Sequence, residues 1–205
     1  MSGADVANAL GLDAHARVWR HDASIVRKSF GKRFWNPQTG WLDDVVDGPD
    51  GSDPACRPNQ VLAIGLHHDV LDERYRVAVV GAVEVRLLTP AGLRTLDPAD
   101  ERYRGQCVGD IQSRDAAYHN GTVWPWLLGP FCAAYLKARG RSAETRSKVR
   151  EWIAPMARHL GTEGCLGSVS EIFDGDAPHT PRGCVAQAWS VAEVARVLLE
   201  ELRRP

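Results

Sequence analysis

The residues best placed to do chemistry in this 205-residue chain surround Glu171. Glu171 follows Ser170 and precedes the apolar pair Ile172 and Phe173, neighbours that could restrict the solvation of its carboxylate. Hydrolysis of a glycosidic bond generally uses two carboxyl groups, one to protonate the leaving oxygen and one to activate water or attack the sugar. Glu171 is therefore a candidate catalytic carboxylate, with a solvated loop glutamate as the alternative. Asp174 and Asp176 lie in a Gly- and Pro-rich run that predicts turn-forming roles.

A second group of candidates lies in the run from Phe34 to Gly48, FWNPQTGWLDDVVDG. An aromatic face can pack on a pyranose ring, and carboxylates and amides can hydrogen-bond its hydroxyls. The alternative is a capped turn with buried tryptophans and an Arg57 salt bridge. The residues concerned are Trp35, Trp41, Asp43, Asp44 and Asp47, followed by Arg57 and Asn59 of the RPN string.

A third group lies between Gly109 and Trp126, in the run GDIQSRDAAYHNGTVWPW. An Arg-Asp pair there could grip hydroxyls or brace the loop, and a histidine could donate to an oxygen. A lone histidine is more often a hydrogen-bonded structural residue, which is the alternative. The polar and aromatic residues of this run are Arg114, Asp115, Tyr118, His119, Trp124 and Trp126.

Helical periodicity recurs along the chain and period-two alternation is rare, so the sequence predicts an all-α fold. Gly31, Gly140 and Gly161 are expected to end helices, Ser142 to cap one, and Pro130 to bend one or shift its start. The last helix has the clearest apolar stripe, which includes Trp189 and predicts a buried face. The six expected helices cover approximately residues 16–30, 58–66, 72–88, 124–139, 142–160 and 185–202.

Three long connections separate these helices and hold all three candidate groups. They span residues 31–57, 90–123 and 162–183, and they are rich in aromatic residues as well as in Gly, Pro and Asp. Connections longer than about 15 residues are uncommon in compact domains unless they are functional or disordered. The aromatic content predicts ordered loops that form a site.

Composition bounds the class of protein. The 25 Lys+Arg nearly balance the 26 Asp+Glu, so no basic field indicates nucleic acid or an anionic membrane. No signal peptide or span of about 20 apolar residues is visible, and we expect a soluble cytoplasmic protein. Five scattered cysteines indicate neither a disulfide framework nor a zinc site. One domain over residues 1–205, with no metal or cofactor, is expected.

The three candidate runs, taken together, resemble the amylo-α-1,6-glucosidase domain at the C-terminal end of glycogen debranching enzymes. Four strings carry the resemblance in the family's order and cover most of the chain from Phe34 to Leu199. They are FWNPQTGWLDDVVDG, RPNQVLAIGL, RDAAYHNGTVWPWLLGPF and GSVSEIFDGDAPHTPRGCVAQAWSVAEVAR. The resemblance implies an (α/α)6 toroid with long loops at one end, inverting hydrolysis of α-1,6-linked glucose at glycogen branch points, and no cofactor.

The resemblance also implies roles for individual residues. Glu171, in SVSEIFDGD, matches the family's general base, which activates water for attack on the anomeric carbon. The other matching residues are expected to contact substrate or brace the loops that do. They are Asp44, Asp47, Arg57, Asn59, Asp115, His119 and Trp124.

Two departures from the family pattern qualify this expectation. The family's general acid is expected in an upstream Trp-Met-Asp motif, which these 205 residues lack. Six helices also make only half of a twelve-helix toroid. We therefore expect a partial domain that needs a separate N-terminal half or self-association, with a non-catalytic α-glucan-binding remnant or an inactive fragment as the alternative. A related toroid hydrolase such as a glucoamylase or trehalase is a third reading.

Overall fold

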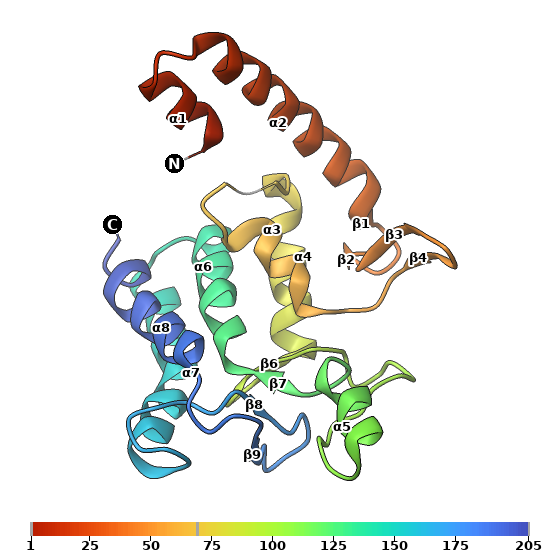
Figure 1. Cartoon of the computed structure of the whole chain (residues 1–205), viewed down its shortest axis with the longest axis vertical. Coiled ribbons are helices and arrows are strands. Elements are labelled where there is room, and N and C mark those ends of the chain that lie inside the picture. Colours follow the sequence, from red (N-terminus) through yellow and green to blue (C-terminus); the bar gives the residue numbers. More distant parts are fainter. Residues whose placement is uncertain (1, 69, 205) are drawn as a thin grey trace.

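The computed structural model describes residues 2–68 and 70–204 and is predominantly helical (Figure 1). Three short helical turns adjoin longer helices: the 3-10 turns η1 (Pro58–Val61) and η2 (Pro125–Leu127), and the π-helical turn η3 (Val197–Glu201). The α-helices are α1 (Gly3–Ala9), α2 (Asp13–Phe34), α3 (Leu62–Gly65), α4 (Glu73–Arg86), α5 (Ile111–Tyr118), α6 (Leu128–Arg139), α7 (Ala143–Thr162) and α8 (Ala188–Arg196).

Short strands correct the expectation of an all-α fold. One hairpin pairs β1 (Trp35–Asn36) with β2 (Trp41–Leu42), and another pairs β3 (Val45–Gly48) with β4 (Gly51–Asp53). A third, five-stranded antiparallel sheet has the order β5-β6-β7-β8-β9. Its strands are β5 (Leu88–Thr89), β6 (Gly92–Arg94), β7 (Val123–Trp124), β8 (Ile172–Phe173) and β9 (Pro181–Arg182).

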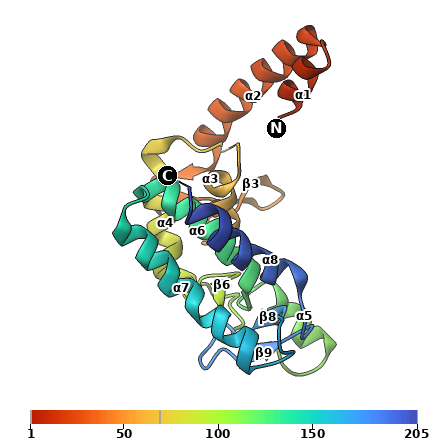
Figure 2. The ribbon, with the colours of Figure 1, turned by 90° about the vertical axis from the view of Figure 1, so that its left-hand side faces the viewer.

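Helix α6 is the centre of the core. Every residue from Leu128 to Leu136 is buried, which is the pattern of a helix enclosed on all sides rather than an amphipathic one. Helices α3 and α4 pack on one side of it and α7 and α8 on the other (Figure 1), so that α7 and α8 face the viewer in Figure 2. The close approach of α3 depends on Gly65, because a Cβ there would lie 2.5 Å from the carbonyl oxygen of Pro130.

Local signals placed several helix ends correctly. Ser142 caps α7 as expected, by accepting a hydrogen bond from the Thr145 amide. The expected start near residue 72 is also close, since α4 begins at Glu73, where Asp72 provides a cap that was not predicted. Gly140 follows α6 with a φ of 83°, the left-handed conformation that glycine adopts without strain. Pro130 shifts the start of the helix as expected, because α6 begins at Leu128 and places the proline in its first turn.

Other expected bounds were wrong. Helix α2 continues through Gly31 to Phe34, and α7 continues past Gly161 to Thr162. Two further helices, α1 and α5, were not expected at all. No helix in the described part of the chain combines the length and apolar character needed to cross a membrane.

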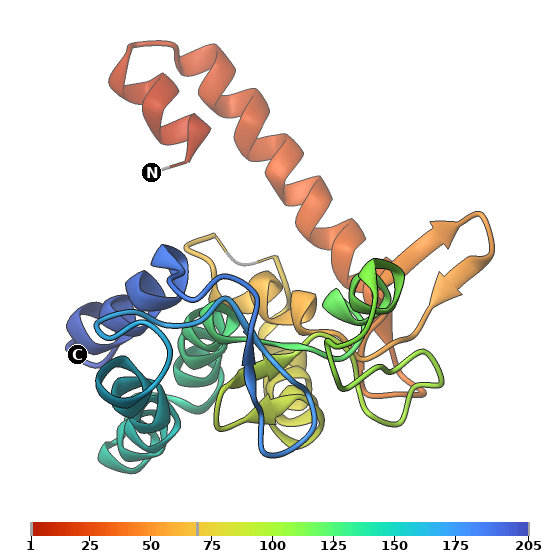
Figure 3. The same ribbon diagram turned by 60° about the horizontal axis from the view of Figure 1, so that its bottom comes forward.

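Helices α1 and α2 form a hairpin that extends away from the body (Figures 1 and 3). The small core of this hairpin consists of Ala4, Ala7 and Ala16. The large apolar residues of the helix expected at residues 16–30 are therefore largely uncovered; Trp19 is 45% exposed and Val26 is 55% exposed. Near its C-terminal end, α2 packs against β1 and β3 of the body.

Candidate active site

The five-stranded sheet brings the predicted loops together. In this sheet β7 belongs to the second loop, and β8 and β9 belong to the third; Val123 pairs with Phe173, and Ile172 pairs with Arg182. Strands this short escaped the sequence analysis because two residues cannot show an alternating pattern. The sheet nevertheless sets where Trp124 and Glu171 emerge.

A cleft of about 480 Å³ opens beside this sheet. Five of the eight predicted site residues line it: Asp44, Arg57, Asn59, His119 and Trp124. The loops that contribute them are far apart in sequence, so the structure gathers these candidates into one place. The cleft is completed by Pro58, Thr95, Trp126, Leu127 and Trp189.

Arg57 braces one wall of the cleft. Its Nε lies 3.3 Å from Asp44 Oδ2, and both side chains are only 16% exposed. Its terminal nitrogens donate to the carbonyl oxygens of Thr95 at 3.2 Å and His119 at 2.6 Å, and to Asn120 Oδ1 at 2.8 Å. Most of the five N–H donors of the guanidinium are thus used within the protein. Arg57 holds the first and second loops in register, which agrees with the salt-bridge alternative.

Asp44 and Asn59 present a polar edge. Asn59 Nδ2 donates to Asp44 Oδ1 at 2.9 Å, so the carboxylate of Asp44 is held by both Asn59 and Arg57. Carboxylate oxygens accept up to about four hydrogen bonds, so capacity remains for a hydroxyl. This pair can orient a polyol.

Aromatic rings line another part of the cleft. The His119 ring stacks on Trp124 with ring centroids 5.2 Å apart and an interplanar angle of 11°. Trp189 meets Trp126 at 5.6 Å and Trp124 at 5.8 Å. Burial, and secondarily the charge of Arg57, lowers the pKa of His119 below its usual value, so the imidazole is neutral near pH 7. A wall of this kind suits the apolar face of a sugar ring.

Glu171 is not among the residues that line the cleft; it directly precedes β8, at the base of the β8–β9 hairpin. Its Oε1 accepts a 2.5 Å hydrogen bond from the Tyr118 hydroxyl, and its Oε2 accepts a 2.9 Å bond from the Cys184 amide. The Tyr118 ring contacts Trp124 edge to face at 4.9 Å, which links Glu171 to the cleft. Burial, together with the Glu171 hydrogen bond and charge, raises the pKa of Tyr118 to about 12, so the hydroxyl remains a donor at neutral pH.

Gly183 makes room for Glu171. Its φ of 66° is left-handed, and a Cβ at this position would lie 2.5 Å from Glu171 Oε2. Glycine is thus required for both the backbone conformation and the space. The loop can close over the carboxylate only because residue 183 has no side chain.

Several predicted residues lie elsewhere. Asp47 is exposed and forms an ion pair with Arg33, and Asp115 is exposed on α5; neither lines the cleft. Trp35 stacks on Tyr75 with centroids 4.1 Å apart, and Arg86 covers one face of Trp41. These two tryptophans pack within the protein.

Asp174 and Asp176 have structural partners, in keeping with the predicted turn. Asp174 is buried, where it accepts from the Cys107 amide at 2.9 Å and from Arg182 Nη2 at 2.9 Å. Asp176 Oδ1 accepts from the Tyr103 hydroxyl at 3.0 Å. Both carboxylates thereby stabilise the loop that ends beside Glu171.

The sequence analysis missed three residues of the site. Tyr118 was part of a candidate run but was given no role of its own. Trp126 and Trp189 line the cleft, although Trp189 had been assigned to the buried stripe of the last helix. Trp189 is 45% exposed, and the residues of α8 that are buried are Ser190 and Val194.

Comparisons with known proteins bear on the family and the fold of this chain. A family model described as amylo-alpha-1,6-glucosidase matches residues 4–196. A glycogen debranching enzyme of Saccharomyces cerevisiae is 31% identical over an alignment of 136 residues, and the match covers 54% of this chain and 9% of that protein. A neutral trehalase of the same yeast has a similar fold, with a TM-score of 0.62 and 18% identity over 92% of this chain and 32% of that chain. The chain therefore spans only a part of each relative.

Proposed function

Because this chain belongs to the amylo-alpha-1,6-glucosidase family, we propose that it takes part in hydrolysing the α-1,6-linked glucose left at glycogen branch points. The observation that supports this most directly is the position of Glu171. Tyr118 and the Cys184 amide fix its carboxylate next to an aromatic cleft that is large enough for a glucose unit. A cytoplasmic location and an α-glucan substrate follow from this proposal.

In the proposed reaction Glu171 is the general base. Its two oxygens each accept one protein hydrogen bond, which leaves lone pairs to orient a water molecule and take its proton. Attack by that water on the anomeric carbon breaks the bond to the leaving oxygen and inverts the configuration. Trp124 supplies the apolar face for the sugar, and Asp44 and Asn59 form hydrogen bonds with its hydroxyls.

The leaving oxygen requires a proton donor. The family's Trp-Met-Asp motif does not occur in these 205 residues, so we propose that the general acid comes from a separate polypeptide segment that completes an (α/α)6 toroid. Asp47 and Asp115, which lie away from the cleft, would brace loops or contact outer parts of the glucan. No cofactor takes part.

Complementation tests this function. The chain is mixed with a polypeptide carrying the helices and the Trp-Met-Asp motif expected upstream in the family, and branched limit dextrin is added. Proton NMR at early times should show β-glucose, the inverted anomer, from the mixture only. Release of α-glucose, or none from a mixture shown to form a complex, would contradict the proposal; release by the chain alone would remove the need for the second polypeptide.

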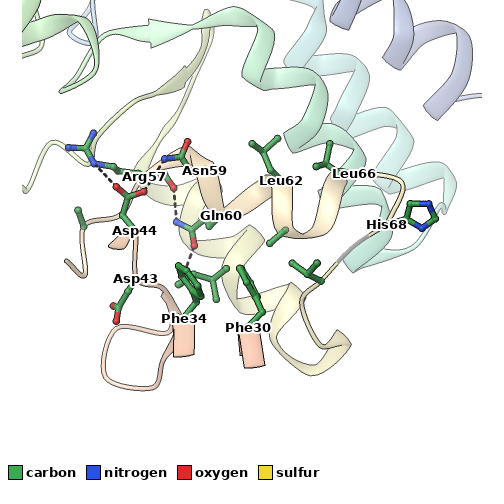
Figure 4. Close-up of a pocket in the computed structure, with 14 residues that line it drawn as sticks. Phe30, Phe34, Asp43, Asp44, Arg57, Asn59, Gln60, Leu62, Leu66 and His68 are labelled. Atoms are coloured by element: carbon green, nitrogen blue, oxygen red, sulfur yellow. Dashed lines mark hydrogen bonds and ion pairs between the residues drawn. The ribbon is translucent and has the colours of Figure 1, made fainter. Parts of the chain in front are cut away.

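A second function is that of an α-glucan-binding module without catalysis. The cleft favours it, because Arg57, Asp44 and Asn59 give the cleft a braced polar edge (Figure 4) while Glu171 does not line it. Calorimetric titration with maltooligosaccharides should then show binding that is weakened by Trp124→Ala. No heat and no thermal shift at millimolar sugar would reject it.

A further inference from the structure

A buried histidine lies against the residue that precedes Glu171. His159 belongs to the last turn of α7 and is only 4% exposed. Its Nε2 lies 3.4 Å from the amide nitrogen of Ser170 and 3.3 Å from the Ser170 hydroxyl oxygen. Ser170 is itself buried. The imidazole therefore connects α7 directly to the segment that carries Glu171.

The donors around the ring determine which of its nitrogens carries the proton. The Ser170 amide can only donate, so Nε2 must accept through its lone pair. The proton of the neutral ring is then on Nδ1, which lies 3.2 Å from Glu163 Oε2. A glutamine oxygen or a water molecule can accept that second bond equally, because the Glu163 side chain is 61% exposed. The contact with buried Ser170 is the one that depends on the imidazole.

Both contacts between His159 and Ser170 are long for hydrogen bonds, as expected when two donors share one lone pair. A buried N–H group that loses its acceptor is costly, because water cannot replace the lost bond. Without the imidazole, the chain around Ser170 would have to shift to find another acceptor for its amide.

His159 also contacts the chain on the far side of Glu171. Its ring meets Phe173 of β8 edge to face, with ring centroids 5.0 Å apart. The loop after α7 approaches this contact closely at Gly164, which has a φ of 62°; a Cβ there would lie 3.2 Å from Ser170 Oγ. Residues before and after Glu171 in the sequence are thus held against α7.

The remaining backbone bonds of this segment run to a different part of the chain. The Glu171 amide donates to the carbonyl of Cys184 at 2.8 Å, and the Gln187 amide donates to the carbonyl of Val169 at 2.8 Å. These bonds join the segment to the residues that lead into α8, whereas His159 joins it to α7. A shift of the Ser170 amide would move the adjacent Glu171 carboxylate relative to the Tyr118 hydroxyl.

We propose that His159 is a positioning residue for Glu171: its neutral imidazole holds the Ser170 amide and thereby fixes the direction of the neighbouring carboxylate. The effect on catalysis rests on the proposed function, in which Glu171 is the general base. A displacement of about 1 Å at a reacting group can lower a rate about 10²-fold. The loss of His159 should therefore lower kcat and leave KM nearly unchanged.

The first test needs no variant chain and no glucan. Carbon-13 NMR of the isotope-labelled chain at pH 7 should show His159 as the Nδ1–H tautomer, with its signals assigned by their absence from His159→Gln. The Nε2–H tautomer or a protonated ring would overturn the proposal, because neither form can accept from the Ser170 amide. This test decides the matter even where a substitution prevents folding.

Two substitutions separate the acceptor from the volume of the ring. His159→Gln keeps an oxygen that can accept from Ser170, whereas His159→Phe keeps a ring without an acceptor. The readout is the pKa of Tyr118, which burial and then the Glu171 hydrogen bond raise to about 12, measured by absorbance at 295 nm and assigned with Tyr118→Phe. This pKa should fall in His159→Phe, as in Glu171→Gln, and should stay near its original value in His159→Gln.

Met156→Ala is the matched control for a general loss of stability. Met156 is 3% exposed and precedes His159 by one turn of α7, so its truncation weakens the packing of the same helix without removing the acceptor. Circular dichroism establishes that each variant is folded. An unchanged Tyr118 pKa in His159→Phe would overturn the proposal, as would an equal fall in His159→Gln or Met156→Ala.

The complemented reaction on limit dextrin then tests the catalytic effect. His159→Phe should lower kcat at least about tenfold with KM within about twofold, and His159→Gln should keep kcat within about threefold. An unchanged kcat in a His159→Phe chain whose Tyr118 pKa has fallen would overturn the positioning role. If the unaltered chain releases no glucose, the proposed function fails, but the tautomer and the Tyr118 titration still decide whether His159 holds Glu171.

Discussion

Arg57 is the residue whose removal should disturb the candidate site most. Its guanidinium joins Asp44 in the first loop to the carbonyl of Thr95 and to His119 and Asn120 in the second. The change Arg57→Met keeps an unbranched stem of similar length and removes every one of these interactions. The loops that form the two walls would lose their main connection.

The magnitude follows from the burial of the pair. Removing one partner of a buried, hydrogen-bonded ion pair costs about 3–5 kcal/mol, because the other charge is left without compensation. The 16% exposure of Arg57 and Asp44 lets water reach the carboxylate, and we expect about 2–4 kcal/mol. For a chain of this size that lowers the melting temperature by about 4–16 °C.

Arg102 provides the matched control. It also joins two carboxylates, those of Asp53 and Asp100, but its side chain is 45% exposed. Exposed ion pairs contribute about 0–1 kcal/mol, so Arg102→Met should shift the melting temperature by less than about 4 °C. Differential scanning fluorimetry of both variants gives the comparison. A larger shift for Arg102→Met than for Arg57→Met would refute the bracing role of Arg57.

Three further predictions concern Glu171. Tyr118→Phe removes a charge-assisted hydrogen bond to Glu171 worth about 1.5–3 kcal/mol, so the kcat for glucose release by the complemented enzyme should fall about tenfold or more with little change in KM. Tyr103→Phe, which removes the hydrogen bond to Asp176 instead, should leave kcat unchanged. Gly183→Ala should destabilise the fold by about 1–3 kcal/mol in urea titrations, and more than Gly11→Ala, which has a similar φ of 73° but nothing within 4 Å. Absorbance at 295 nm should show Tyr118 titrating near pH 12. Glu171→Gln should lower the pKa of Tyr118, but burial, the largest cause of the shift, should keep that pKa above about 10. Because the pKa is raised in the folded state, the stability contributed by Tyr118 is complete below about pH 10 and is lost as the pH rises to about 12. An unchanged Tyr118 titration in Glu171→Gln would argue against the contact between these two residues.

Signals carried by a few adjacent residues were sufficient for much of the helical framework. Ser142 as a cap, Gly140 as a terminator and Pro130 in a first turn act through local backbone geometry, so a single sequence displays them. Gly31 misled because a glycine inside a helix costs only about 1 kcal/mol, and Phe30 and Phe34 on either side of it pack against the main core.

The site itself was harder to predict. Helical periodicity cannot distinguish a core face from a face that lines a cleft, which is why Trp189 was expected in the core. The contact between Tyr118 and Glu171 joins residues 53 positions apart through a sheet of very short strands. Patterns along the chain do not predict a contact between residues so far apart. The resemblance to a family, by contrast, identified five of the residues that line the cleft.

The most direct test of the central claim compares Glu171→Gln with the unaltered chain in the complemented reaction on limit dextrin. Glutamine is nearly isosteric but cannot take a proton from water, so the initial rate of glucose release should fall about 10²–10⁴-fold. The exposed Glu163 gives the matched control, and Glu163→Gln should stay within about twofold. Glucose release by Glu171→Gln at more than about a tenth of the unaltered rate would contradict the assignment of Glu171 as the general base.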